Sequence, residues 1–410
     1  VPFGNNREKK PRPQIPYSSV PFGTAHKICK ILTIRTTYFI IYKKGIGWKI
    51  IMEINIKDLS IEEKIGQMII VGLDTTEPYA RLEELIIKHK VGGILLYKKN
   101  YKTYEEMVKL INHIKKLNSN NKVPILICID QEGGRVNRMP KEFLNIPPAN
   151  TLANYKDEEL VKKAGKVMAE MLSSVGINLN FAPVLDIKRF SNNHAIGDRA
   201  FSDDIEQIKK YSTIIIEELQ DKNIIPVIKH FPGHGLTVSD THFKIPIVKK
   251  EIEEIENTDM QPFEEAIKKG ADAVLISHMK IKKADSKNPV SISRRFICKY
   301  LRKKYRYNGV ILTDDMRMRS MRLKYGEYIA IQKAFQAGND IIVFKNILND
   351  KIYEKLLKDI KLQKIKESRI NKSVNRVLKM KEKYKINDKE IDIDNNLIDR
   401  INNQIKNLLF

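Results

Sequence analysis

A chain of 410 residues is long enough for one large domain or two of ordinary size, and its hydrophobic fraction of 42% is sufficient for a full soluble core. A formal net charge of +24 at pH 7 raises the question of a nucleic-acid or anionic-surface partner, but the lysines are spread over every segment and no run interleaves them with aromatic residues. We therefore predict a lysine-rich solvated surface and no nucleic-acid partner.

Residues 1–51 differ in composition from the rest of the chain. They contain ten lysines and arginines against a single acid, Glu8. Their apolar part, 31–42, includes Arg35, is too short to span a bilayer and is not followed by a small-residue cleavage site. We predict that 1–51 is a basic extension, disordered or foreign to the native protein, and that the folded domain begins at Met52.

From Met52 onward, short apolar runs alternate with stretches of helical period. The runs are rich in Ile and Val and apolar at consecutive positions, as expected for strands that are covered on both faces. There are eight of them, at 67–73, 92–97, 124–130, 178–186, 224–230, 273–278, 309–314 and 340–344. Between them, residues such as 107–117 show apolar positions three and four apart, and Asp157 is placed to cap the helix that follows it.

Eight strand–helix repeats predict an α/β fold, a (β/α)8 barrel of the TIM type. We expect one catalytic domain over 52–386, followed by a polar, helical tail over 387–410. A doubly wound dinucleotide-binding sheet would need Gly-x-Gly-x-x-Gly after an early strand, and the sequence lacks it. The pattern therefore favours the barrel and indicates no cofactor.

Polar residues stand at the ends of the apolar runs. They are Asp74, Lys98, Asp130, Asp186, His230, His278, Asp314 and Asn346. The C-terminal ends of barrel strands converge on one face, where the loops build the active site. One polar ending only marks where a strand meets water, but eight endings dominated by Asp, His and Lys predict a polar site.

The segment 229–242 contains three histidines, a lysine and an aspartate. Its sequence is Lys-His-Phe-Pro-Gly-His-Gly-Leu-Thr-Val-Ser-Asp-Thr-His. Its proline and two glycines predict a mobile loop after the fifth strand. Asp240 and His242 lie two residues apart, so in an extended loop they share a face, and an aspartate beside a histidine orients it for proton transfer. His234 is expected to serve the architecture of the loop. A lone loop histidine is usually solvent-exposed, but this concentration of His, Lys and Asp favours a catalytic or binding role for the loop. Without cysteines nearby or histidines on a helix, we predict no metal.

Two further motifs end strands with carboxylates. ILTDDM closes the seventh run with Asp314 and Asp315: one should point into the barrel mouth, where it can attack an anomeric carbon, and the other can cap the next helix. DQEGGRVNR closes the third run with Asp130, which can accept hydrogen bonds from sugar hydroxyls, and its glycines allow a turn that returns Arg138 over the mouth. Arg199, in IGDRAF, is a candidate to reach in from the fourth strand's loop. For each arginine alone, a solvated surface charge is the alternative.

Together these motifs resemble glycoside hydrolase family 3, in the branch of bacterial β-N-acetylglucosaminidases (β-hexosaminidases) of cell-wall turnover. The resemblance covers about 61–384 and is carried by DQEGGRV, FAPVLDI, IGDRAF, KHFPGHG followed by Asp-x-His, and ILTDDM, in that order. It implies that Asp314 is the nucleophile of a retaining double displacement and that His242 is the acid/base, tuned by Asp240. It also implies that the sugar next to the cleaved bond is bound by Asp130, Arg138, Arg199, Lys229 and His230.

The activity implied is that of an exo-β-N-acetylglucosaminidase, which removes terminal N-acetylhexosamine from cell-wall-derived muropeptides or related oligosaccharides. The resemblance implies a small carbohydrate as the partner of the protein, and it implies no cofactor, metal, nucleic acid or membrane. Two alternatives remain open: a phosphorylase or another β-glycosidase of the same family, and a non-catalytic barrel that binds carbohydrate or anions. Three scattered cysteines and no recognisable signal peptide predict a reducing, cytoplasmic location, whereas the oligomeric state is left open.

Overall fold

The computed structural model describes residues 29–34, 37–44, 47–190, 193–237, 245–345 and 350–409, which fall into two units, Val1–Glu53 and Ile54–Phe410. The first unit contains an antiparallel sheet of β1 (Cys29–Ile34), β2 (Thr37–Lys44) and β3 (Gly47–Glu53). The β-branched and aromatic residues of these segments favour strands. Residues 1–28 of the basic extension lie outside the described part of the chain.

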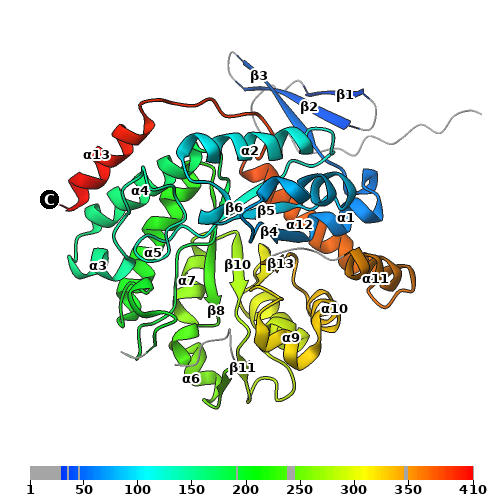
Figure 1. Cartoon of the computed structure of the whole chain (residues 1–410). Helices are drawn as coiled ribbons and strands as arrows, with labels where there is room; N and C mark the ends of the chain where they lie inside the picture. The colour runs from blue at the N-terminus through cyan, green and yellow to red at the C-terminus, as the bar shows by residue number, and fades with distance from the viewer. Residues whose placement is uncertain are drawn as a thin grey trace, which may run out of the picture. The chain divides into compact units, whose positions relative to one another are not determined.

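The second unit is built on eight parallel strands that form a barrel (Figure 1). They are β4 (Ile69–Gly72), β5 (Gly93–Leu96), β6 (Leu126–Ile129), β7 (Leu179–Asn180), β8 (Ile225–Phe231), β10 (Ala273–Ile276), β12 (Val310–Thr313) and β13 (Ile342–Phe344). The strands pair in the order β12-β10-β8-β7-β6-β5-β4-β13, and a parallel bridge between Leu312 and Ile341 joins the two ends. Seven of the eight predicted runs contain one of these strands and the run 224–230 overlaps β8, which ends one residue later, so the predicted barrel is confirmed. A separate short pair, β9 (Ile247–Val248) and β11 (Lys280–Ile281), lies outside it.

Helices surround the strands of this unit (Figure 1). The α-helices are α1 (Ile61–Gln67), α2 (Tyr104–Asn118), α3 (Ala149–Asn154), α4 (Glu158–Ser174), α5 (Ile205–Asp221), α6 (Ile252–Glu256), α7 (Gln261–Lys268), α8 (Arg294–Phe296), α9 (Arg319–Tyr325), α10 (Glu327–Ala337), α11 (Asp350–Lys361), α12 (Glu367–Lys383) and α13 (Leu397–Leu409). Two π-helical segments, η3 (Glu84–Lys88) and η8 (Ile297–Lys304), complete the outer layer. Asp157 caps α4 as predicted, because its side chain accepts from the main-chain N–H groups of Glu159 and Leu160.

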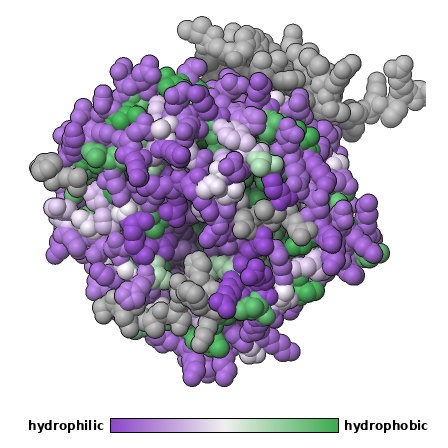
Figure 2. Space-filling model, in the orientation of Figure 1, coloured by the Kyte–Doolittle hydropathy of each residue, from purple (hydrophilic) through white to green (hydrophobic). Residues whose placement is uncertain are grey.

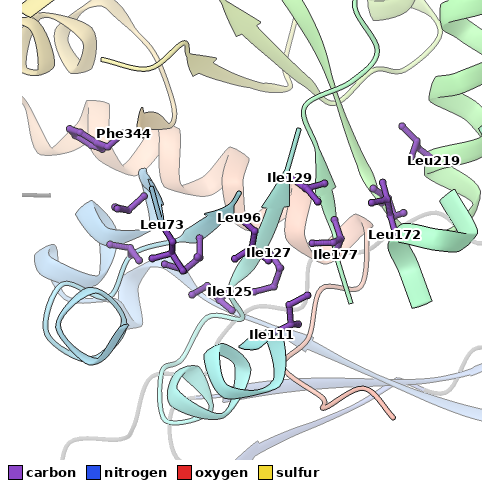
Figure 3. Close-up of a cluster of buried hydrophobic side chains, with 14 of the residues drawn as sticks. Leu73, Leu96, Ile111, Ile125, Ile127, Ile129, Leu172, Ile177, Leu219 and Phe344 are labelled. Carbon is purple, nitrogen blue, oxygen red and sulfur yellow. The ribbon is translucent and has the colours of Figure 1, made fainter. Parts of the chain in front are cut away.

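The strands are buried on both faces because alternate side chains enter two different cores. Inward-facing residues such as Val227 and Leu275 fill the barrel interior, whereas outward-facing residues pack against the helices. Figure 3 shows part of the outer core, where Ile127 and Ile129 of β6 lie near Ile111 of α2. Continuous burial along each strand explains why the sequence shows apolar runs without alternation.

Helix α12 contributes to closing the N-terminal end of the barrel. Val377 and Met380 of α12 and its C-cap residue Tyr384 belong to the interior core. The buried Lys381 Nζ donates to the side chain of Gln67 (2.7 Å) and to the carbonyls of Gly92 (3.0 Å) and Pro124 (2.6 Å), which precede β4, β5 and β6. These contacts engage main-chain carbonyls before two strands and a side chain before a third, so the opposite, C-terminal face is the one available to ligands.

The surface of the second unit is strongly polar. On the face shown in Figure 2, hydrophilic side chains predominate and hydrophobic residues are scattered among them. Within the described ranges, no helix is both long and apolar enough to cross a membrane.

Candidate active site

A cavity of about 510 Å³ opens at the C-terminal ends of the strands. Its lining comes from the ends of β5, β6, β8, β10, β12 and β13 and from the loops that follow β6 and β7. It includes six of the eight residues predicted for the site, which are Asp130, Arg138, Arg199, Lys229, His230 and Asp314. The other two, Asp240 and His242, lie outside the described residues.

Lys229, at the end of β8, is held between two carboxylates. Its Nζ lies 2.9 Å from Asp130 Oδ1 and 2.6 Å from Glu132 Oε1, and only 3% of its side chain is exposed. Glu132 also pairs with Arg199, whose Nε and Nη2 donate to its two oxygens at 2.7 and 2.8 Å. These contacts join the loops after β6 and β7 to β8, so that the floor of the cavity is a network of paired charges.

Glu132, the centre of this network, is not among the site residues predicted from the sequence. Burial alone would raise the pKa of Glu132, but the charges of Lys229 and Arg199 outweigh burial and lower the pKa well below its usual range. Burial disfavours the charged guanidinium of Arg199, but Glu132 outweighs it and raises the pKa of Arg199. The carboxylate therefore stays ionised at neutral pH.

His230, adjacent to Lys229, is oriented by a second buried carboxylate. Its Nδ1 lies 2.6 Å from Asp186 Oδ2, and its main-chain N–H donates to Asp186 Oδ1 at 3.2 Å. The N–H of His234 donates to the same oxygen at 2.5 Å. Burial would raise the pKa of Asp186, but the interactions with His230 and His234 outweigh it and lower the pKa. Asp186 thus fixes the imidazole of His230 through one nitrogen, and His230 lines the cavity.

Asp314 and Asp315, at the end of β12, have different hydrogen-bond partners. The N–H of Asp314 donates to Ile276 O at 2.9 Å, which continues the pairing with β10, and Asp314 Oδ1 accepts from the N–H of Asp315 at 2.8 Å. Asp315 Oδ1 accepts from the N–H groups of Arg317 (3.0 Å) and Lys345 (2.8 Å), so it holds the loops after β12 and β13 together. Burial raises the pKa of Asp315, although these two N–H groups act against the rise.

The sequence of this barrel matches a family of enzymes. The family model described as the glycosyl hydrolase family 3 N-terminal domain matches residues 60–380. The chain belongs to glycoside hydrolase family 3. The predicted family membership is therefore confirmed, and the cavity at the strand ends lies where barrel enzymes carry their active sites.

Named relatives of this family 3 chain are similar in sequence and structure. A beta-hexosaminidase of Hydrogenovibrio crunogenus is 32% identical over 298 residues, 70% of this chain and 82% of that protein. A beta-hexosaminidase of Tolumonas auensis is 37% identical over 268 residues, 64% of this chain and 78% of that protein. The solved structure of a glycoside hydrolase family 3 beta-N-acetylglucosaminidase from Paenibacillus sp. str. FPU-7 aligns with a TM-score of 0.80 at 29% identity, over 85% of this chain and 68% of the other.

Gly233 and Gly235, after β8, allow close packing at the start of the loop. A Cβ atom on Gly235 would lie 2.1 Å from the carbonyl oxygen of Ile187. Gly233 has a φ of +126°, and a Cβ there would lie 2.8 Å from the Cβ of Asp259. Both positions therefore require glycine, and they hold the start of this loop against its neighbours. His234 of this family 3 chain also lines the cavity.

The polar strand ends do not all face the cavity, contrary to the uniform pattern expected from the sequence. Asp130, His230 and Asp314 line it, whereas Asp186 lies buried behind His230. His278 is also fully buried, with Nδ1 2.8 Å from Ser291 Oγ and Nε2 2.9 Å from the carbonyl oxygen of Asp315. Its contacts support the main chain at the end of β12. Asn346 lies outside the described residues.

Within the described ranges, one group of His, Cys, Asp or Glu side chains is close enough to hold a metal ion, and it lies away from the cavity. It consists of Glu84, His89 and Asp350. Arg81 forms two hydrogen bonds to Glu84 (2.8 and 2.5 Å), and Lys88 lies 2.7 Å from Asp350. Two cations thus already balance the two carboxylates, which makes the cluster a poor fit for a divalent ion.

Proposed function

We propose that the chain is a retaining exo-β-N-acetylglucosaminidase. Its substrates would be cell-wall-derived muropeptides or related oligosaccharides that end in N-acetylhexosamine. The observation that carries the proposal is the convergence of six residues, from four separate motifs, on one cavity. The names of the similar beta-hexosaminidases support an amino sugar as the group removed, and the cell-wall origin of the substrate rests on the resemblance of the motifs.

In the proposed reaction, a carboxylate oxygen of Asp314 attacks the anomeric carbon as the glycosidic C–O bond breaks. His242, held by Asp240, gives its proton to the departing oxygen. Water then loses a proton to His242 and attacks the same carbon, which releases Asp314 and retains the anomeric configuration. The position of Asp314 at a strand end in the cavity supports this role because strand ends place side chains rigidly.

Cationic side chains surround the proposed sugar subsite. Asp130 can accept from sugar hydroxyls while it remains 2.9 Å from Lys229 Nζ. The second ring nitrogen of His230 is available for a hydrogen bond to the sugar because Asp186 binds the first. Arg138 lines the cavity and provides further donors. Because this charged network is already formed before the substrate binds, its side chains need little reorganisation on binding.

The experiment is a panel of aryl β-glycosides (N-acetylglucosaminide, glucoside and xyloside), each assayed with and without inorganic phosphate. We expect hydrolysis of the N-acetylglucosaminide far above the other two, with free sugar as the product in both conditions. Release of sugar 1-phosphate only when phosphate is supplied would identify a phosphorylase instead. Equal inactivity of the wild type and the Asp314→Ala variant on every substrate would identify a binding barrel.

A further inference from the structure

A second cavity, which shares no lining residue with the first, has a strongly basic lining. Its volume is about 760 Å³, larger than that of the catalytic cavity. It is bordered by the start of α8, the C-terminal end of α10 and the segment from 363 to the first turns of α12. The lining contains seven cationic side chains, which are Arg294, Arg295, Lys333, Lys364, Lys366, Arg369 and Lys372. We refer to it as the basic groove.

Few carboxylates balance these charges. The single acid in the lining, Asp285, accepts hydrogen bonds from the N–H groups of Lys287 and Asn288 and from Ser293 Oγ (2.6 Å), so it is occupied within its own loop. Four of the cations, Arg294, Arg295, Lys366 and Lys372, have no carboxylate partner within the described part of the chain. These four side chains are exposed, and like charges gathered along one hollow attract an anion.

The remaining geometry also favours an anion. Lys366 is the N-cap of α12, a helix of 17 residues, and its side chain makes no capping hydrogen bond. The first turn of α12 carries the positive end of a long helix dipole, and Ser368 of that turn lines the groove. The acid of the same turn, Glu367, is paired with Lys64 at 3.0 Å. Arg369 is fixed in place by the carbonyl oxygen of Asn339 at 2.8 Å. The groove thus combines a fixed guanidinium with exposed, unpaired cations.

We propose that the basic groove binds a small free anion that carries two or more phosphate groups. Arginine and lysine side chains on several elements can contact several phosphates at once, and guanidinium groups match phosphate oxygens in pairs. The proposal is independent of the glycosidase function, because no residue of the groove lines the catalytic cavity.

The lining argues against two larger anionic partners. It contains no aromatic residue on which a nucleic-acid base could stack. Its apolar members Ile292, Ala337 and Ile365 are each no more than 5% exposed, so they form a floor and offer no apolar anchor to a lipid surface. A hollow with a polar, cationic wall suits a compact ligand.

The test measures binding of inorganic triphosphate to the full chain by calorimetry at about 0.15 M salt, where weak surface attraction is screened. The groove variant is Arg295→Gln/Lys366→Gln/Lys372→Gln. The matched control, Lys141→Gln/Lys163→Gln/Lys269→Gln, removes the same charge from exposed lysines elsewhere. We expect the groove variant to lose at least about tenfold in affinity, because each lost ion pair contributes about two- to threefold, and the control to bind like the wild type. Both variants should keep wild-type hydrolysis of the aryl glycoside.

Several results would overturn the proposal. One is equal weakening in both variants, which would indicate a general effect of net charge. Another is undiminished binding by the groove variant together with inhibition of hydrolysis by triphosphate, which would place the anion in the catalytic cavity. The absence of binding by the wild type, or sedimentation with vesicles rich in phosphatidylserine without binding of free triphosphate, would also refute it.

Discussion

Replacement of Glu132 by Gln is the most informative test of the charged network, because it removes one charge and keeps the shape of the side chain. In the wild type, Glu132 pairs with Lys229 at 2.6 Å and with Arg199 through two hydrogen bonds. The variant leaves Lys229 with Asp130 alone and Arg199 with the carbonyl oxygen of Ala195 at 2.8 Å. Both cations remain buried, so they cannot recover full hydration.

The expected loss of stability follows from this burial. Loss of one partner of a buried ion pair typically costs about 3–5 kcal/mol. Because Asp130 still pairs with Lys229, we expect the lower end, about 3 kcal/mol in the free energy of unfolding. A displacement of Lys229 and Arg199 by about 1 Å would also lower kcat/KM by up to about 100-fold.

The assay is urea unfolding of wild type and Glu132→Gln, with Glu217→Gln as a control that changes an exposed carboxylate. The pH dependence provides a second check, because the pKa of Glu132 in the folded state is lowered. The stabilisation is complete above the pKa of about 4.3 in the unfolded chain and is lost as the pH falls through the lower folded-state pKa. The difference between variant and wild type should therefore be constant from about pH 7 to 5 and shrink in stronger acid. Equal stability of Glu132→Gln and Glu217→Gln at pH 7 would refute this account.

Three further changes test other parts of the site. Asp186→Asn removes the charge that orients His230, and we expect kcat/KM for the aryl N-acetylglucosaminide to fall by about 10- to 100-fold; wild-type kinetics would contradict the assigned contact. Gly235→Ala places a Cβ 2.1 Å from a carbonyl oxygen and should lower the urea midpoint sharply, whereas Gly165→Ala, inside α4, should stay within about 1 kcal/mol of wild type. His242→Ala should lose far more rate on glycosides with poor leaving groups than on activated aryl glycosides; equal losses on both would exclude it as the acid.

The barrel was predictable because strands that are buried on both faces are apolar at consecutive positions in the sequence. Runs such as 126–129 and 310–313 are apolar at every position except the terminal Thr313, since one set of side chains fills the interior and the other packs against helices. The length of the loops and the tertiary contacts determine the limits of each strand. For this reason the predicted run 178–186 contains only the two-residue strand β7.

The cavity was less predictable, because a polar strand end has the same appearance in sequence whether it faces a ligand or a neighbour. Asp186 and His278 are fully buried and support other groups, whereas Asp130 and Asp314 line the cavity. Glu132 lies in a glycine-containing loop and looks like a solvated charge until Lys229 and Arg199 converge on it in space. The position of Glu132 two residues after the predicted Asp130, within DQEGGRV, was the available signal.

The central claim, that Asp314 is the nucleophile of a retaining glycosidase, is tested most directly by trapping the glycosyl-enzyme. A slow fluoro-sugar substrate is incubated with the full chain, and the labelled peptide is located by mass spectrometry. We expect one label, on a peptide that contains Asp314, and loss of labelling in the Asp314→Ala variant. A label on any other carboxylate, or turnover of the aryl glycoside by Asp314→Ala at the wild-type rate, would contradict the account.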